Sequence, residues 1–83
     1  MKRLAWEPAA RAGLRRIEQK QAIQILHALS DFSESGNGDV KKLVDDTLGR
    51  YRLRVGDWRI LFRFEKAGLI RILSIENRKD AYR

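Results

Sequence analysis

Apolar residues recur with a helical period in the first part of the chain. Two stripes have the spacing of one helical face: Ala10, Leu14 and Ile17, then Ala22, Ile25, Leu26, Leu29 and Phe32. Pro8 suits a first helical turn, where a missing N–H is not needed. We therefore expect a short strand within residues 2–7, followed by two helices that form an antiparallel hairpin.

Alternation replaces the helical period in the second part of the chain. Residues 33–39 are rich in Ser, Gly and Asn and predict a loop between a helical half and a strand half. Apolar and charged residues then alternate over 51–55 and 58–65, and Gly56-Asp57 between them matches a two-residue hairpin loop. A turn at 66–68 precedes a third strand over 69–75. This third strand is apolar on both faces, which favours a central position in the sheet.

The short hairpin loop fixes which residues face each other. One face pairs apolar residues: Val55 with Trp58, Leu53 with Ile60, and Tyr51 with Phe62. The other face places Arg54 opposite Arg59, and Arg50 opposite Arg63. Arg52 lies diagonal to Arg59.

Opposed like charges destabilise a pair of strands, so the arginine face has a cost for folding. We interpret it as a docking surface for phosphate, which guanidinium groups bind in a bidentate manner. The alternative is a solvated strand face whose arginines pair with nearby carboxylates. Asp57, Glu65 and Glu76 are the candidates for that pairing.

Composition narrows the class of protein. The chain has 83 residues, a net charge of +7 and 43% hydrophobic residues, which predicts a single α+β domain over 1–83 that attracts polyanions. No apolar run approaches the roughly 20 residues of a membrane span, and no secretory signal is expected. The absence of cysteine and the single histidine, His27, argue against metal sites and cofactors. A cytoplasmic location fits this composition.

Two segments carry a resemblance to a known family. They are Tyr51-Arg52-Leu53-Arg54-Val55-Gly56-Asp57-Trp58-Arg59-Ile60 and Asn77-Arg78-Lys79-Asp80-Ala81-Tyr82-Arg83. With these motifs the chain resembles the RelE/ParE superfamily of toxins from type II toxin–antitoxin systems, and looks closest to the RelE-type messenger-RNA interferases. The resemblance implies a RelE-like α+β fold, in which an N-terminal strand and a helical hairpin pack on a small antiparallel sheet.

The resemblance also implies site residues. The family's catalytic positions fall on Arg52, Arg54, Arg59, Arg78 and Tyr82. Further basic residues are expected to bind the RNA: Arg50, Lys41, Lys42, Arg63 and Lys79. Many relatives carry Gly-His just before the tail arginine, where this chain has Glu76 and Asn77. Glu76 is a candidate general base in place of the missing imidazole.

The implied activity is metal-independent, ribosome-dependent cleavage of messenger RNA. The implied partners are the ribosome-bound message and a cognate antitoxin, whose acidic or amphipathic segment wraps the toxin. Operator DNA would be bound only through the antitoxin, and no membrane is involved. Two alternatives stay open: a ParE-type inhibitor of DNA gyrase, and an inactive RelE-fold binding module.

Overall fold

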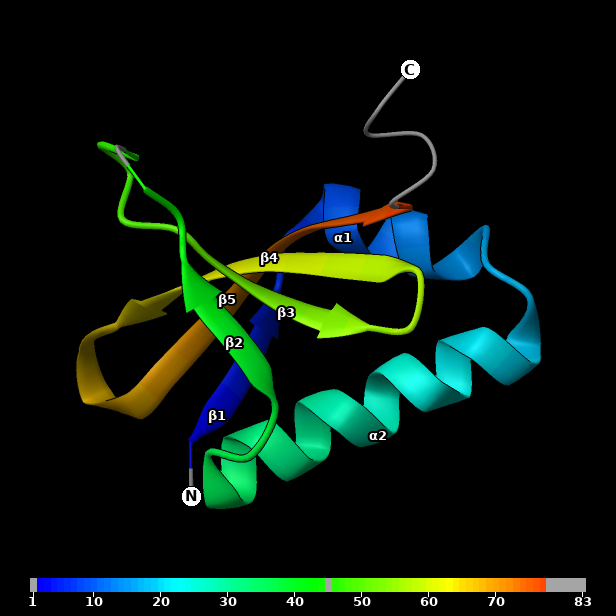
Figure 1. Ribbon diagram of the computed structural model, residues 1–83, viewed down its shortest axis with the longest axis horizontal. Helices are drawn as coiled ribbons and strands as arrows, with labels where there is room; N and C mark the ends of the chain where they lie inside the picture. Colours follow the sequence, from blue (N-terminus) through cyan, green and yellow to red (C-terminus); the bar gives the residue numbers. More distant parts are fainter. Residues whose placement is uncertain (1, 45, 78–83) are drawn as a thin grey trace.

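Two helices and five strands make up the fold. The computed structural model describes residues 2–44 and 46–77. The order of elements is β1 (Arg3–Trp6), α1 (Pro8–Arg15), α2 (Gln19–Ser35), β2 (Asp39–Lys42), β3 (Tyr51–Val55), β4 (Trp58–Glu65), a 3-10 turn (Lys66–Gly68) and β5 (Leu69–Asn77). Figure 1 shows α2 returning in roughly the opposite direction to α1, as the predicted helical hairpin requires. In these described ranges no helix has the length and apolar character that crossing a bilayer demands.

The start of α1 and the end of α2 lie where the local sequence favours them. Pro8 occupies the first turn of α1, as predicted. The last turn of α2 is closed by Gly36, whose φ of 81° is accessible because glycine has no Cβ. The predicted apolar stripes are largely confirmed, since Ile25 and Leu29 are completely buried. Leu26 was placed on the same stripe but is 41% exposed, because it lies at the margin of the buried face.

The strands form one sheet in the order β1-β5-β4-β3-β2. All neighbouring strands are antiparallel except β1 and β5, which run parallel from the pair Arg3–Leu69 to the pair Trp6–Ile72. The middle strand is therefore β4, while β5 is interior between β1 and β4. The sequence pattern did not predict β2, since its alternation covers only four residues and one apolar side chain, Val40.

The hairpin of β3 and β4 has the predicted register. Val55 pairs with Trp58, and Arg54 pairs with Arg59. Gly56 adopts a φ of 59°, which the first position of a tight hairpin turn requires. The prediction that Arg50 pairs with Arg63 is wrong, because β3 starts at Tyr51 and the ladder between β3 and β4 ends at the pair Tyr51–Phe62.

The hydrophobic core lies on the face of the sheet that the helices cover. Its buried members are Ala10, Ile25, Leu29, Phe32, Leu53, Ile60, Phe62, Ile70 and Ile72. Helix α1 packs mainly on β5, and α2 contacts β3. The opposite side carries alternate residues of the same strands and is called the open face here. It includes Arg52, Arg54, Arg59, Leu61, Arg63, Arg71, Ser74 and Glu76.

A bulge in β5 changes which residues reach the open face. Leu61 pairs with Ser74 and Phe62 with Ile72, so Leu73 is an extra residue without a partner on β4. If the strand alternated strictly through Leu73, with no bulge, position 76 would lie on the same face as Ile72 and point toward the helices. The bulge instead turns Ile75 toward α1, where its Cβ lies 3.7 Å from the position that a Cβ on Gly13 would occupy. Glu76 consequently lies on the open face.

An ion-pair cluster centred on Glu65 links strands at the end of the sheet opposite the turn between β3 and β4. The carboxylate of Glu65 accepts hydrogen bonds of 2.9 Å from the Nε atoms of both Arg71 and Arg63. Arg71 also approaches Glu7 at 3.6 Å. The hydrogen bond from Arg71, and then that from Arg63, lowers the pKa of Glu65 below its ordinary value of 4.5. The cluster joins β4 and β5 to the segment that leads into α1.

Gly38 should be a position where a methyl group destabilises the fold. Its φ is +148°, and an added Cβ would lie 2.8 Å from Cδ1 of the buried Leu53. We expect Gly38→Ala to lower the free energy of unfolding by about 1–3 kcal/mol in urea titrations. Gly13→Ala is the control, because Gly13 is helical and the new Cβ makes only an ordinary contact with Ile75. A Gly38→Ala protein as stable as Gly13→Ala would contradict this account.

The Glu65 cluster should make stability depend on pH in the acidic range. A carboxyl group with a lowered pKa in the folded state stabilises the fold above its unfolded pKa, and loses this contribution as the pH falls through the folded value. We therefore expect the Tm of the wild type to drop more between about pH 6 and pH 3 than the Tm of Glu65→Gln. Glu34→Gln, at an exposed site on α2, should keep the drop of the wild type. Equal acid sensitivity of Glu65→Gln and wild type would refute the assignment.

Candidate functional site

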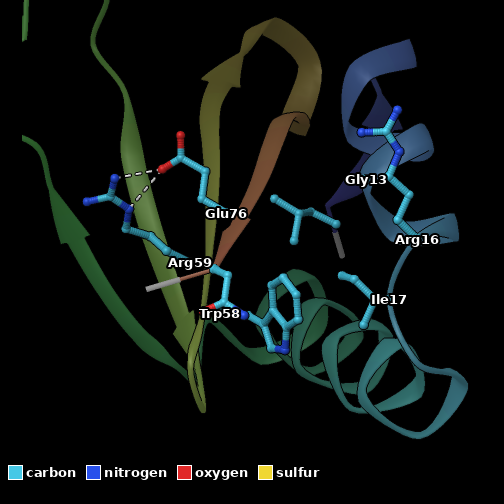
Figure 2. A pocket seen from close by; sticks show the side chains of 8 residues that line it. Gly13, Arg16, Ile17, Trp58, Arg59 and Glu76 are labelled. Carbon is cyan, nitrogen blue, oxygen red and sulfur yellow. Dashed lines mark hydrogen bonds and ion pairs between the residues drawn. The ribbon is translucent and has the colours of Figure 1, made fainter. Parts of the chain in front are cut away.

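A pocket opens where α1 ends beside the sheet (Figure 2). Its volume is about 530 Å³. The lining residues come from the C-terminal end of α1 and the segment after it, from the start of β4 and from the end of β5: Gly13, Arg16, Ile17, Trp58, Arg59, Ile75, Glu76 and Asn77. The pocket thus has an apolar wall, and the residues at its rim include Arg16, Arg59 and Glu76.

Arg59 and Glu76 form the polar edge of this pocket. They are direct neighbours on β4 and β5, and both project from the open face. The Nη2 atom of Arg59 donates a hydrogen bond of 2.6 Å to Oε1 of Glu76, and Nε donates one of 3.2 Å to the same oxygen. Figure 2 shows the two side chains pointing toward each other and away from Ile17 and Arg16. Each side chain is 40% exposed, so the pair is accessible to a ligand.

The pair belongs to a row of charges that crosses four strands. Asp39 pairs with Arg54, Arg54 with Arg59, and Arg59 with Glu76, so two cations lie between two carboxylates. Arg54 is exposed and makes no ion pair with the described residues. The sequence correctly predicted that Arg54 and Arg59 are opposed. It did not predict the carboxylate at either end of the row.

Arg52 lies in the next row of the open face. Its Nη1 atom donates to the backbone oxygen of Asp39 at 3.1 Å and to Oδ1 of the same residue at 3.3 Å. The Arg52 side chain is only 15% exposed, and its neighbour across the strands, Leu61, is 5% exposed. Such burial indicates that the aliphatic stem of Arg52 lies against the sheet, as long charged side chains do over apolar surface.

The guanidinium groups of Arg50 and Arg63 also form ion pairs with carboxylates. Arg50 donates to both oxygens of Asp46, at 3.0 and 3.2 Å, and Arg63 pairs with Glu65 at 2.9 Å. The hydrogen bond from the Arg50 side chain lowers the pKa of Asp46 below its ordinary value of 3.8. These contacts form because neighbouring strands and the β2–β3 loop bring acidic side chains within reach.

Most arginines of the predicted cluster are therefore paired with carboxylates, as the alternative interpretation of a solvated strand face expected. Arg50, Arg52, Arg59 and Arg63 each have an acidic partner within the chain. Glu65 and Glu76 act as two of the three partners that the sequence suggested as alternatives. Asp57 makes no ion pair among the described residues, and Asp39 and Asp46 were not expected to contribute.

The two lysines of β2 face opposite sides of the sheet. Lys41 pairs with Arg52 and lies on the open face, while Lys42 pairs with Tyr51 and belongs to the side of Val40, which packs on the core. Only Lys41 therefore joins the basic residues of the open face. Three further site predictions, Arg78, Lys79 and Tyr82, lie outside the described residues.

The pocket itself was not predicted. Trp58 and Ile17 were expected as core residues and do pack against the core, yet they also line the pocket. Arg16 also lines the pocket. The local sequence pattern does not signal that Trp58, Ile17 and Arg16 line a pocket, because the pocket arises from the position of α1 on β5. No group of acidic or imidazole side chains suited to a metal ion occurs in residues 2–44 and 46–77.

The fold is shared with solved toxin–antitoxin structures. The similar chains include one from the RelE–RelB complex of the archaeon Pyrococcus horikoshii, with 22% identity, a TM-score of 0.77 and coverage of 93% of this chain and 94% of that one. Another is from the RelBE2 complex of Mycobacterium tuberculosis, with 22% identity, a TM-score of 0.80 and coverage of 93% and 98%. A third is from the YoeB dimer of Staphylococcus aureus, with 19% identity, a TM-score of 0.73 and coverage of 90% of this chain and 94% of that one. At these identities the similarity establishes the RelE-like fold.

The sequence itself matches a family model. No curated protein sequence gives a match. The model that does match describes the ParE toxin of the parDE type II toxin–antitoxin system, and the match extends from residue 4 to residue 82. Because this match covers nearly the whole chain, the protein belongs to the ParE toxin family, within the RelE/ParE superfamily of type II toxin–antitoxin toxins.

Proposed function

We propose that this toxin cleaves messenger RNA on the ribosome and binds the scissile phosphate between Arg54 and Arg59. The observation that supports this most is the row on the open face, where these two opposed guanidinium groups lie beside the carboxylate of Glu76. Cleavage through the ribose 2′-hydroxyl needs a cationic site for the phosphorane and a group that takes a proton. The row brings both kinds of group together next to a pocket.

The ion pairs of the open face are compatible with phosphate binding. Solvent-exposed pairs contribute at most about 1 kcal/mol, so a ligand with stronger charge can replace one partner. Arg59 and Glu76 are each 40% exposed, and Arg54 has no ion pair to break within the described residues. A phosphodiester can therefore accept hydrogen bonds from Arg59 in the bidentate manner typical of guanidinium groups.

Other residues of the site have supporting roles in this proposal. Arg52 would bind a flanking phosphate together with Lys41, its neighbour on β2. Arg78 and Tyr82 remain candidates on the strength of the family resemblance. In this proposal Tyr82 orients or assists the nucleophile. Arginine stays protonated and serves to stabilise charge.

A cognate antitoxin is part of the proposal. Several structures with this fold are toxin–antitoxin complexes, among them the RelE–RelB complexes of Pyrococcus horikoshii and Methanococcus jannaschii. With a charge of +7, this chain suits an antitoxin segment that is acidic or amphipathic and covers the open face. Any contact with operator DNA would then be made by the antitoxin. Messenger RNA on ribosomes places the activity in the cytoplasm.

Inhibition of DNA gyrase is the second candidate function. Two observations favour it: the matching family model is that of ParE toxins, and most arginines of the open face are already neutralised by carboxylates of the chain. A gyrase inhibitor needs a surface for a protein partner and no groups for proton transfer. An inactive binding module is the remaining alternative.

Short expression in growing bacteria separates these functions. An active interferase removes messenger RNA and leaves cuts within codons, which primer extension detects. A gyrase inhibitor leaves messages intact and induces the DNA-damage response. Unimpeded growth would indicate an inactive toxin. Intact messages in growth-arrested cells would overturn the proposed function.

Loss of either opposed arginine should abolish cleavage without unfolding the protein. We expect Arg59→Ala and Arg54→Ala to slow cleavage of ribosome-bound messenger RNA by about 10²- to 10³-fold, since each removes a donor from the transition state. Thermal melting should change little, because both side chains are solvent-accessible. Lys66→Ala removes one positive charge at the opposite end of β4 and should cleave like the wild type. An Arg59→Ala toxin of full activity would exclude this role.

A further inference from the structure

We infer that Glu76 is the general base that takes the proton from the 2′-hydroxyl of the messenger RNA. This inference rests on the proposed function and assigns to one carboxylate the proton-transfer step that arginines are unable to perform.

Glu76 is held in position by Arg59, and its second oxygen has no hydrogen-bond partner among the described residues. Both hydrogen bonds from Arg59 end on Oε1. The second oxygen, Oε2, accepts no hydrogen bond from the described residues and is visible as the unbonded oxygen in Figure 2. A carboxylate oriented through one oxygen and open at the other is suited to accept a proton from a ligand. With 40% of its side chain exposed, Glu76 can be reached by a ribose hydroxyl.

Glu76 and Arg59 present their charged groups together on the open face, at one edge of the pocket. A phosphate bound to Arg59 on this face brings the adjacent 2′-hydroxyl toward Glu76, because this hydroxyl and the phosphate are on neighbouring ribose carbons and Arg59 is hydrogen-bonded to Glu76.

The charged groups around Glu76 are cationic. Among the described residues they are Arg59 on β4, Arg54 beyond it on β3, and Arg50, whose charge interacts with that of Glu76. These cations can stabilise the dianionic phosphorane while Glu76 takes the proton.

Other carboxylates of the open face are less suitable. Glu65 has both oxygens engaged by Arg63 and Arg71, and Asp46 has both engaged by Arg50. Asp39 is the competitor, because it binds Arg52 through Oδ1 alone and pairs in register with Arg54. It does not line the pocket, and it lies two strands away from the Arg59–Glu76 pair.

The proposed step is a transesterification. The 2′ oxygen transfers its proton to Oε2 of Glu76 and forms a bond to phosphorus, and the bond between phosphorus and the 5′ oxygen breaks. The departing 5′ oxygen takes a proton from water. The products are a 2′,3′-cyclic phosphate and a 5′-hydroxyl end, and Glu76 then returns its proton to solvent.

Replacing Glu76 by glutamine tests the inference in single-turnover cleavage of ribosome-bound messenger RNA. Glutamine keeps an oxygen for Arg59 but has no basic carboxylate. We expect kcat to fall by about 10²- to 10⁴-fold with KM unchanged or lower, since removing a negative charge favours RNA binding. Glu76→Asp should retain more activity than Glu76→Gln. Formate should partly restore cleavage by Glu76→Ala, as a small carboxylate can occupy the vacated space.

Two comparisons make the result decisive. Glu34→Gln changes the net charge by the same amount on the exposed side of α2 and should cleave like the wild type. Undiminished kcat in Glu76→Gln, or a loss seen in Asp39→Asn instead, would overturn the assignment of Glu76. A lack of formate rescue combined with a raised KM would indicate a structural role for Glu76 and would also overturn it. A wild-type toxin that leaves messenger RNA uncut would instead refute the proposed function.

Discussion

The tight turn at Gly56 and Asp57 determines the side on which every residue of β3 and β4 lies. With two residues in the turn, Val55 must pair with Trp58, and each later pair follows from that one. Apolar side chains then face the helices, and Arg54 and Arg59 face outward. A shift of one residue would bury these guanidinium groups and expose the core. Core formation and the presentation of opposed cations are therefore consequences of the same constraint.

On the open face, nearby carboxylates offset the repulsion between Arg54 and Arg59. Opposed arginines are costly, and the chain places Asp39 and Glu76 at the two ends of the row in which Arg54 and Arg59 lie. Exposed pairs of this kind stabilise the fold only weakly, so they can exchange a carboxylate for another anion. These ion pairs offset the repulsion between the arginines in the folded protein. Because the pairs are weak, the guanidinium groups stay available to a ligand. This explains how a surface can be paired within the chain and still suit phosphate.

Local patterns were sufficient for much of the fold. The helical stripes, the hairpin register and the family motifs predicted the α+β architecture and the opposition of Arg54 and Arg59. They were insufficient where the outcome depends on contacts distant in sequence. Strand β2 has only four residues, the pairing of Glu76 with Arg59 depends on the bulge at Leu73, and the pocket depends on how α1 packs on β5. Ion pairs between strands are likewise invisible until strand order is known.

The parallel pairing of β1 with β5 has a consequence for the order of assembly. Residues 3–6 are made before residues 69–72 and have no partner in the sheet until those residues have been synthesised. The middle strand, β4, likewise needs β5 for one of its two neighbours. During translation the nascent chain can form its helices and the β3–β4 hairpin early, because these contacts are local. Without β5 it lacks both Ile72 in the core and Glu76 beside Arg59, so the open face is completed only after the final strand has emerged.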